Sequence, residues 1–445
     1  MVKPVKYLLI LWALAFCWPT WQVAGQFVGK SYVINYDIRS YGGGNQSWSV
    51  AAGHDGMVYV GNDRGLLEFD GSNWRLYPMP GGGIIRSVCV GEDGLVYAGS
   101  FEEFGYWRRD QGGLVYQSLS SELVRQGTLH NDEIWRIVEH DGNLYFQSFS
   151  RIFVFDKKEI TLLSPETSFV LLMEARSRLF IHMVDRGLYE VRPDTLLFIP
   201  GSAFLAGDEI KVMLPFGRSE YLAGASGSGL FLFDGTGFTR WDHPVNREIR
   251  EASINNGLAG HGLIAIGTIG DGLYLFDQGG HFRHHLNTGN SLQNNTVLGL
   301  GFQPAGNLWV ALDSGLDLVN LNTSLDFYVD PSGDLGTVYT AFADGTGLLV
   351  GTNQGLYRYR FADDHGFTDP AIIPGLQGQV WDLKNIEGEI YCGHNSGTYR
   401  LEEDRPVKIS DISGGYELKS YRQGESQYLL QSTYSAFALY AQLAG

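Results

Sequence analysis

The stretch Gly229-Leu230-Phe231-Leu232-Phe233-Asp234 recurs along this chain in slightly altered copies. Two close copies are Gly65-Leu66-Leu67-Glu68-Phe69-Asp70 and Gly272-Leu273-Tyr274-Leu275-Phe276-Asp277. Weaker copies begin at Gly187, Gly315, Gly355 and Gly397, so from position 187 the phrase returns every 40 to 43 residues. A period near forty residues in strand-rich repeats is typical of a β-propeller, in which each repeat forms one blade.

Each repeat also carries the signals of a β-hairpin ahead of the Gly-Leu phrase. In the first repeat an apolar stretch at 48–51 leads to the turn His54-Asp55-Gly56 and then to a second apolar run at 57–61. Asp-Gly between two β-rich runs indicates a tight hairpin, because both turn positions favour positive φ. Further repeats open near Arg86, Ile134, Phe169, Ile210, Ile249, Val297, Val338 and Val380, and a tenth near Tyr416.

The number of repeats decides the predicted domain organisation. Nine repeats and the start of a tenth exceed the roughly four to eight blades of a closed propeller. The sequence therefore predicts an all-β fold, with a seven-bladed β-propeller over residues 26–330 and an incomplete second propeller over 331–445. An early strand at 32–36 is expected to pair into the last blade and close the ring. Because the chain stops inside a repeat, we expect it to be a fragment of a longer protein.

The composition excludes two broad classes of protein. The chain has 445 residues, of which 44% are hydrophobic and 13% aromatic, so it can bury a large core and is not globally disordered. Its formal net charge is −17. Since neutralising phosphates requires a basic surface, this segment is not expected to bind nucleic acid.

The N-terminus has the pattern of a targeting segment. Lys3 and Lys6 precede an apolar run at 7–16, and small residues follow at 23–25. This pattern predicts a secretory signal peptide over residues 1–25, which implies that the mature chain is exported. An uncleaved membrane anchor and a lipoprotein are the alternatives, although the apolar run is short for a membrane span.

Motifs of known enzyme and metal sites are missing from the sequence. It contains no Gly-x-Ser-x-Gly elbow, no His-Glu-x-x-His, no phosphate-binding loop and no EF-hand loop. A metal site formed by His281, His284 and His285 is an alternative. In a strand, however, the neighbouring side chains of His284 and His285 would point to opposite faces. We therefore expect no catalytic residue, no metal and no cofactor, and we expect Cys89 and Cys392 to be unpaired thiols.

The innermost strand of each predicted blade supplies the positions most suited to binding. Aligning the blades on these strands stacks Trp48, Arg86, Trp135, Lys211, Arg250, Leu298, Tyr339 and Trp381 around the central channel. Aromatic faces stack on sugar rings, and arginine forks bind carboxylate or sulfate. The channel mouth is therefore predicted to bind an oligosaccharide, acidic ones included. The alternative is that these aromatic residues pack between blades, and a register slip of one residue would turn every side chain to the other face.

Several stretches of the first three repeats resemble the start of the regulator-propeller sensors, which are membrane-spanning regulators of Gram-negative bacteria. They read YGGGNQSW at 41–48, YVGNDRGLLEFDG at 59–71, WRLYP at 74–78, FEEFGYW at 101–107 and LHNDEIWRI at 129–137. The resemblance covers essentially the whole mature chain, and beyond the third repeat it rests on the generic repeat.

The resemblance implies an architecture for the parent protein. In this family, two periplasmic propellers are followed by a tyrosine-rich β-sandwich (the three-Y domain), a membrane helix and a cytoplasmic output. The output is a DNA-binding helix-turn-helix or a histidine kinase with a response regulator, and the opening motifs favour the first. Many members detect oligosaccharides and switch on genes for using them. This chain ends before the sandwich, so an output activity is implied only for the parent.

Together these features predict a non-enzymatic, periplasmic ligand-sensing module of a membrane-spanning transcriptional regulator. The resemblance implies a small-molecule or oligosaccharide ligand, a homodimeric parent anchored in the inner membrane, and membrane contact only through a C-terminal helix. One alternative is the sensor region of a hybrid histidine kinase. Another is a secreted glycan lyase or hydrolase, whose carboxylates would come from Glu102, Glu103, Asp132 and Glu133. A plain adhesion or assembly scaffold is the third.

Overall fold

The computed structural model describes residues 30–441, except 32, 165–166, 193–194, 323–325, 328–332, 362–369 and 425. The predicted signal peptide lies outside the described residues. The chain divides into two compact units: the first spans Ser31–Asp326, and the second begins at Phe327. Each unit is described by itself below.

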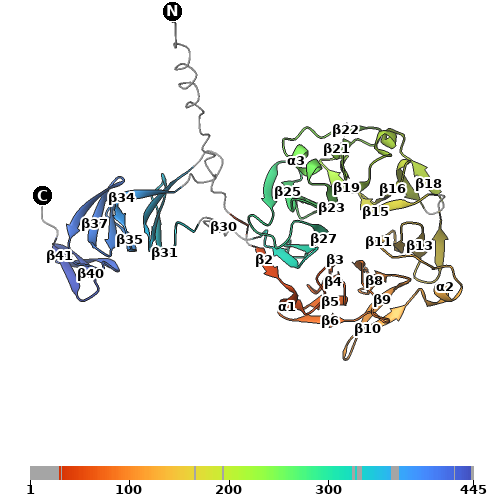
Figure 1. The fold of residues 1–445 in the computed structure, drawn as a ribbon, viewed down its shortest axis with the longest axis horizontal. Helices are drawn as coiled ribbons and strands as arrows, with labels where there is room; N and C mark the ends of the chain where they lie inside the picture. The colour runs from red at the N-terminus through yellow and green to blue at the C-terminus, as the bar shows by residue number, and fades with distance from the viewer. Residues whose placement is uncertain are drawn as a thin grey trace, which may run out of the picture. The chain divides into compact units, whose positions relative to one another are not determined.

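The described part of the first unit folds into seven four-stranded antiparallel sheets (Figure 1). The first four, in spatial order of their strands, are β3 (Ser47–Ala52), β4 (Val58–Asn62), β5 (Gly65–Phe69), β6 (Trp74–Tyr77); β10 (Gly113–Ser118), β9 (Glu103–Asp110), β8 (Val96–Ser100), β7 (Ser87–Val90); β11 (Arg136–His140), β12 (Asn143–Gln147), β13 (Ile152–Phe155), β14 (Ile160–Leu163); and β15 (Phe169–Ala175), β16 (Arg178–Met183), β17 (Gly187–Arg192), β18 (Thr195–Phe198). The other three are β19 (Ile210–Phe216), β20 (Glu220–Ala225), β21 (Gly229–Phe233), β22 (Phe238–Arg240); β23 (Ile254–Gly260), β24 (Leu263–Thr268), β25 (Leu273–Asp277), β26 (Phe282–Leu286); and β2 (Val33–Tyr36), β29 (Leu316–Val319), β28 (Leu308–Leu312), β27 (Val297–Phe302).

The seven sheets follow one another around a common centre, as Figure 1 shows. The strands β3, β7, β11, β15, β19, β23 and β27 each contact the next in this series, and β27 contacts β3. We call these seven the inner strands. The all-β arrangement of four-stranded antiparallel sheets is consistent with the predicted propeller blades.

The early strand joins the last sheet, as the sequence predicted for residues 32–36. In β2, Val33 pairs with Val319 and Tyr36 pairs with Leu316 of β29. The Tyr36 ring also stacks on the ring of Trp309 in β28, with 5.4 Å between their centroids. The start of the first unit is therefore built into the sheet that its last repeat forms.

The recurring Gly-Leu phrase has a clear physical basis. Its leucine is fully buried wherever the phrase is closest to consensus, as at Leu66, Leu230 and Leu273. Its glycine has a positive φ, which is 72° at Gly272, and a Cβ there would lie 2.1 Å from the carbonyl oxygen of Leu286 on the outer strand. Only glycine combines this backbone conformation with so close an approach.

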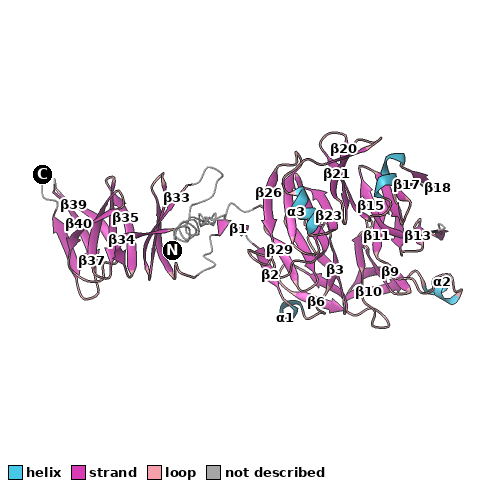
Figure 2. Cartoon of the chain, turned by 45° about the horizontal axis from the view of Figure 1, so that its top comes forward, coloured by secondary structure: helices cyan, strands magenta, loops and turns pink. Residues whose placement is uncertain are grey.

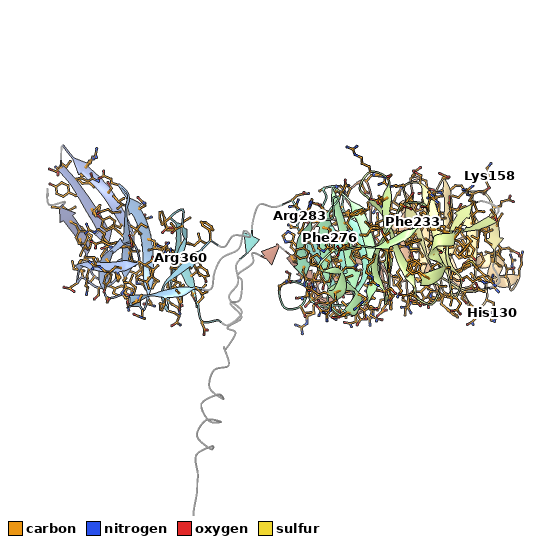
Figure 3. All side chains as sticks on the ribbon, turned by 90° about the horizontal axis from the view of Figure 1, so that it is seen from above. His130, Lys158, Phe233, Phe276, Arg283 and Arg360 are labelled. Carbon is orange, nitrogen blue, oxygen red and sulfur yellow. The ribbon has the colours of Figure 1, made fainter. Side chains whose placement is uncertain are left out.

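The interior between neighbouring sheets is apolar and rich in aromatic rings. Phe233 of β21 and Phe276 of β25 have no exposed surface, whereas Lys158 lies at the surface of the unit (Figure 3). Burial of such side chains between sheets is the main stabilising contribution to a fold of this kind.

The described part of the second unit contains three sheets of the same kind. They are β31 (Val338–Ala343), β32 (Gly347–Thr352), β33 (Gly355–Arg360), β34 (Ala371–Gln377); β35 (Val380–Ile386), β36 (Glu389–His394), β37 (Gly397–Glu402), β38 (Arg405–Ser410); and the three-stranded β39 (Leu418–Gln423), β40 (Ser426–Ser432), β41 (Phe437–Ala441). A short pair of strands, β1 (Lys30–Ser31) and β30 (Asp326–Phe327), lies at the boundary of the two units.

In the part of the chain that the structure describes, helices are few and short, as Figure 2 shows. They are α1 (Ile38–Tyr41), α2 (Ser121–Arg125), the 3-10 helix η1 (Pro200–Leu205) and α3 (Asn246–Glu251). Among the residues that the structure describes, no helix has the length and apolar character that crossing a membrane requires.

Candidate ligand-binding site of the first unit

Most of the predicted channel residues share one local feature, a β-bulge near the start of an inner strand. On β3, Ser47 pairs with Asn62 and Ser49 pairs with Gly61, so Trp48 is the extra residue between them. The same irregularity falls at Lys211, at Leu298 and, in the second unit, at Tyr339 and Trp381. A bulge redirects the side chain of the extra residue, which is why bulges are frequent next to binding sites.

Arg86 and Trp135 occupy the same place in their sheets, just before the assigned inner strands. The backbone N–H of Arg86 donates to the carbonyl of Gly99, the residue that also pairs with Ser87. Trp135 N–H donates to the carbonyl of Gln147 in the same way. Arg86 and Trp135 therefore occupy equivalent positions in their sheets, in agreement with the alignment made from the sequence.

Arg250 is the exception, and its placement on an inner strand was wrong. It lies in helix α3, and the inner strand β23 begins four residues later, at Ile254. The bulge residue of this sheet is Asn255. The distance to the turn glycine could have shown this, since Trp48 and Trp135 precede Gly56 and Gly142 by eight and seven positions, whereas Arg250 precedes Gly262 by twelve.

The inner strands enclose a cavity of about 280 Å³. Four of the residues aligned from the sequence line it together, namely Trp48, Arg86, Trp135 and Leu298. The other lining residues are Ser49, Val50, Ser87, Val88, Arg136, Ile137, Leu171, Asn255, Asn256, Gly299 and Leu300. Lys211 is not among them, and its ammonium group lies 3.1 Å from a carboxylate oxygen of Glu209.

Arg86 lies between the two tryptophans. Its Cζ is 3.9 Å from the ring centroid of Trp48 and 4.7 Å from that of Trp135. Its Nε donates to Oε1 of Glu133 at 2.6 Å, and the indole N–H of Trp48 donates to Asp63 at 3.0 Å. The indole rings are therefore held in place by a cation and a carboxylate, as in a pre-organised binding surface.

A second cavity, of about 270 Å³, is also lined by Trp135. It is lined by Phe101, Asn131, Asp132, Glu133, Trp135, Ser148, Phe149 and Ser150. Phe101 and Phe149 are 53% and 45% exposed, which is high for phenylalanine, and the Phe149 ring lies 5.3 Å from that of Trp135. Sequence reasoning missed both phenylalanines. Their position just after the second strand in two adjacent repeats was the available signal.

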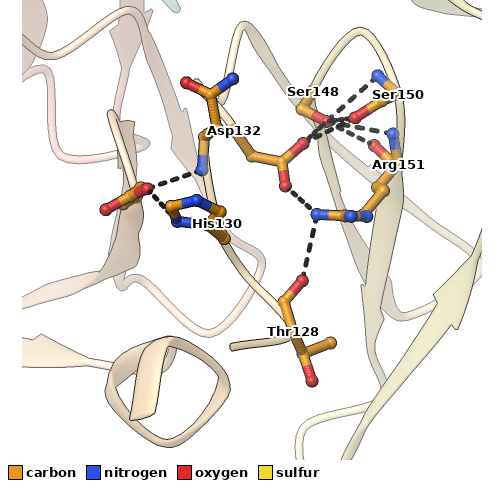
Figure 4. A network of polar contacts seen from close by, with 8 residues as sticks. Thr128, His130, Asp132, Ser148, Ser150 and Arg151 are labelled. Atoms are coloured by element: carbon orange, nitrogen blue, oxygen red, sulfur yellow. Dashed lines mark hydrogen bonds and ion pairs between the residues drawn. The ribbon is translucent and has the colours of Figure 1, made fainter. Parts of the chain in front are cut away.

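A polar network fixes the loop that carries Glu133 (Figure 4). The buried Asp132 carboxylate accepts hydrogen bonds from Ser148 and Ser150, at 2.6 and 2.7 Å, and forms an ion pair with Arg151. Arg151 also donates to the carbonyl of Thr128 at 3.1 Å. Because these contacts join the connection between β12 and β13 to the loop that contains Thr128 and Asp132, they hold Glu133 in position beside Arg86.

All four carboxylates proposed for an enzyme already have partners within the fold. Asp132 and Glu133 are bound as described above. Glu103 accepts hydrogen bonds from Tyr116, Ser118 and Ser120, and Glu102 accepts one from the backbone N–H of Asn131 at 2.6 Å. Each group thus has a structural role in the folded chain.

The remaining two predicted residues meet in the second unit. The rings of Tyr339 and Trp381 stack with 4.8 Å between centroids. Tyr416 lies 5.0 Å from Trp381 on the same cluster, and the Trp381 indole N–H donates to the Tyr434 hydroxyl at 3.0 Å. The predicted aromatic residues therefore form one cluster in each unit, Trp48 with Trp135 and Tyr339 with Trp381.

The residues singled out for metal or thiol chemistry have other surroundings. His285 stacks on Tyr274 at 4.1 Å, and His281 lies 3.0 Å from a carboxylate oxygen of Asp277. Within the described ranges, no group of three or more metal-ligating side chains comes together. Cys89 and Cys392 are free thiols, and burial raises the pKa of Cys89 to about 11 and raises the pKa of Cys392 as well.

Comparisons with known proteins place the fold. No family model and no curated protein matches the chain. It matches an extracellular domain from B. thetaiotaomicron described as belonging to a hybrid two component system, BT3049, with 15% identity, a TM-score of 0.64 and coverage of 92% of this chain and 59% of that one. It also matches the extracellular domain of BT4673 of the same organism, which is described in one structure as a one component system and in another as a hybrid two component system, with 15% identity, a TM-score of 0.53 and coverage of 92% and 58% for the first.

A third match is the WD40 beta propeller domain of Doa1, with 12% identity, a TM-score of 0.52 and coverage of 67% of this chain and 98% of that one. The chain spans less than three fifths of the length of the two bacterial domains. Identities this low show the fold alone. The chain therefore has a β-rich repeat fold that resembles the extracellular sensor domains of bacterial signalling systems.

Proposed function

We propose that this chain is a non-catalytic, periplasmic ligand-sensing module of a membrane-spanning signalling regulator. Its first unit is a closed seven-bladed propeller that binds an oligosaccharide at the mouth of its channel, and its second unit is the opening part of another propeller. The observation that carries the proposal is the pair of adjoining cavities that share Trp135. The likeness in fold to extracellular sensor domains supports it.

The chemistry of the two cavities suits a sugar chain. Trp135 and the exposed rings of Phe101 and Phe149 offer apolar faces for sugar rings. Asn131, Ser148 and Ser150 place amide and hydroxyl groups beside these rings. Two cavities of similar volume side by side favour a ligand with at least two rings, one in each cavity.

Signalling would follow from differential binding. A ligand that binds one arrangement of a homodimeric parent better than another shifts the population toward that arrangement. The output is a helix-turn-helix regulator, as the sequence resemblance favours. The sensor of a hybrid histidine kinase is the second candidate, and the comparisons include both a one component and a hybrid two component system.

Calorimetric titration of the mature chain with neutral and acidic oligosaccharides tests this function. A ligand that binds the unmutated chain should bind the Trp135→Ala and Phe149→Ala variants about three- to tenfold more weakly, because each lost aromatic contact is worth about 0.5–1.5 kcal/mol. Phe204→Ala is the matched control, since Phe204 is an exposed ring outside both cavities. Unchanged affinity in both site variants, or release of new reducing ends or unsaturated sugars, would contradict the proposal.

A further inference from the structure

Arg136 is a cation of the cavity that none of the described residues neutralises. It begins the inner strand β11 and lines the 280 Å³ cavity. Its guanidinium makes no hydrogen bond, ion pair or ring contact with any residue that the structure describes. Burial lowers the pKa of Arg136, which agrees with the lack of a neighbouring carboxylate.

The neighbouring sheets show why Arg136 has no structural partner. In the two preceding sheets the equivalent residue is a serine, and it binds the next inner strand. The N–H of Val88 donates to Ser49 Oγ and the N–H of Ile137 donates to Ser87 Oγ, each at 2.9 Å. After β11 this role passes to a glutamine, because the N–H of Leu172 donates to Oε1 of Gln147 at 2.8 Å. Arg136 is therefore not needed to join the sheets.

The rest of the cavity favours an anion. No Asp or Glu is among its lining residues. Its second cation, Arg86, is paired with Glu133 through Nε, but Arg86 Nη1 is buried without a hydrogen-bond partner. A partly desolvated guanidinium without a counter-ion is costly, and an oxyanion that enters the cavity would offset this cost.

We propose that this cavity selects ligands that carry a carboxylate or sulfate group, and that Arg136 binds that group. The inference rests on the proposed function and narrows it to acidic saccharides. Arg86 supplies a second guanidinium to the cavity lining, from the neighbouring sheet. A planar guanidinium fork matches both kinds of oxyanion, so a uronic acid and a sulfated sugar are both candidate sources.

The direct test is calorimetric titration of the mature chain with three probes. These are a galacturonic acid trisaccharide, a sulfated galactose trisaccharide and the uncharged galactose trisaccharide. We expect one of the two acidic probes to bind at least about tenfold more tightly than the uncharged one. Arg136→Gln should remove this preference, and Arg136→Lys, which keeps the charge without the fork, should restore part of it.

Two further variants sharpen the test. Arg108→Gln removes the same charge from an exposed position on β9 and should leave binding unchanged. Glu133→Gln frees Arg86 from its ion pair and should increase the preference for the acidic probe over the uncharged one. Equal binding of charged and uncharged probes, or an acidic preference that Arg136→Gln leaves intact, would overturn the inference while the sensor function stands.

Thermal unfolding in inorganic sulfate, against sodium chloride of equal ionic strength, gives a readout that does not depend on sugars. Sulfate should raise the Tm more in the unmutated chain and in the Arg108→Gln variant than in the Arg136→Gln variant. If no trisaccharide binds but this difference is found, the anion site stands and the oligosaccharide function is wrong. If no trisaccharide binds and sulfate acts equally on all three proteins, both proposals are wrong.

Discussion

Two arginines on neighbouring sheets illustrate how strongly one position along a strand changes the surroundings of a side chain. Arg86 lies just before the inner strand of its sheet and is held between two indole rings and a carboxylate. Arg136 is one position further along and has none of these partners. The first cation therefore organises the site, and the second remains available to a ligand.

A buried histidine gives the residue-scale prediction. His182 of β16 has no exposed surface, and desolvation lowers its pKa from the ordinary value of 6.5. Between the two pKa values the unfolded chain binds more protons than the folded chain, so the free energy of unfolding falls as the pH drops below about 6.5. As the pH falls from about 8 to about 5, we expect the free energy of unfolding to decrease less in the His182→Leu variant than in the unmutated chain.

Urea unfolding across this pH range checks the expectation. His54→Leu is the control, since His54 is exposed. If His182→Leu and the parent chain lose stability in parallel as the pH falls, the buried histidine does not contribute to the pH dependence.

At the scale of elements, side chains of one inner strand satisfy the backbone of the next. Ser49, Ser87 and Gln147 each accept a hydrogen bond from an N–H of the neighbouring sheet. Asn255 and Asn256 do the converse, because their side-chain amides donate to the carbonyls of Val297 and Leu298. The sheets are therefore joined by specific polar contacts as well as by apolar packing.

The element-scale prediction concerns the bond between β7 and β11. Ser87→Ala leaves the buried N–H of Ile137 without its acceptor, which should lower the free energy of unfolding by about 1–3 kcal/mol. Ser72→Ala, at an exposed turn, should change it by less than about 0.5 kcal/mol. Urea unfolding of both variants measures the difference, and equal stability would show that water replaces the serine.

The elements differ in how far the sequence predicts them. The Gly-Leu phrase and the Asp-Gly turns could be predicted because each arises from a local backbone requirement, as at Gly272. Helix α3 could not, since it occupies the connection just ahead of the inner strand β23, where its residues were taken for the start of that strand, and so Arg250 was misplaced. Phe101 and Phe149 were missed because they lie on loops, where side-chain positions depend on tertiary contacts rather than on strand periodicity.

At the scale of the whole first unit, β2 is the feature that connects the two ends of the repeat series. Beyond its backbone pairing with β29, the Asn35 side-chain amide donates to Asp317 at 2.7 Å and to the carbonyl of Ser291 at 3.1 Å. Asp317 is buried, so its carboxylate depends on such partners. The sequence predicted this pairing from an unassigned strand ahead of the first repeat.

Removing β2 gives the prediction at this scale. A chain that begins at residue 38 should leave the edge of β29 unpaired and uncover Leu316 and Val319, which have no exposed surface in the intact unit. We expect its Tm to fall by at least about 5 °C and the protein to associate in solution. A chain that begins at residue 28 is the control. Thermal unfolding and size-exclusion chromatography measure both effects, and a monomer with an unchanged Tm would contradict the prediction.

The pairing of β2 with β29 also sets the order of events during biosynthesis. The ribosome makes Tyr36 early, but its partner Leu316 is made only after the rest of the first unit. The first unit therefore cannot reach its complete hydrogen-bonded state while it is still emerging, and contacts between residues so distant in sequence form slowly. With the signal peptide that the sequence predicts, this delay would be useful, because a secretion channel that threads unfolded polypeptide would receive the chain before folding is complete.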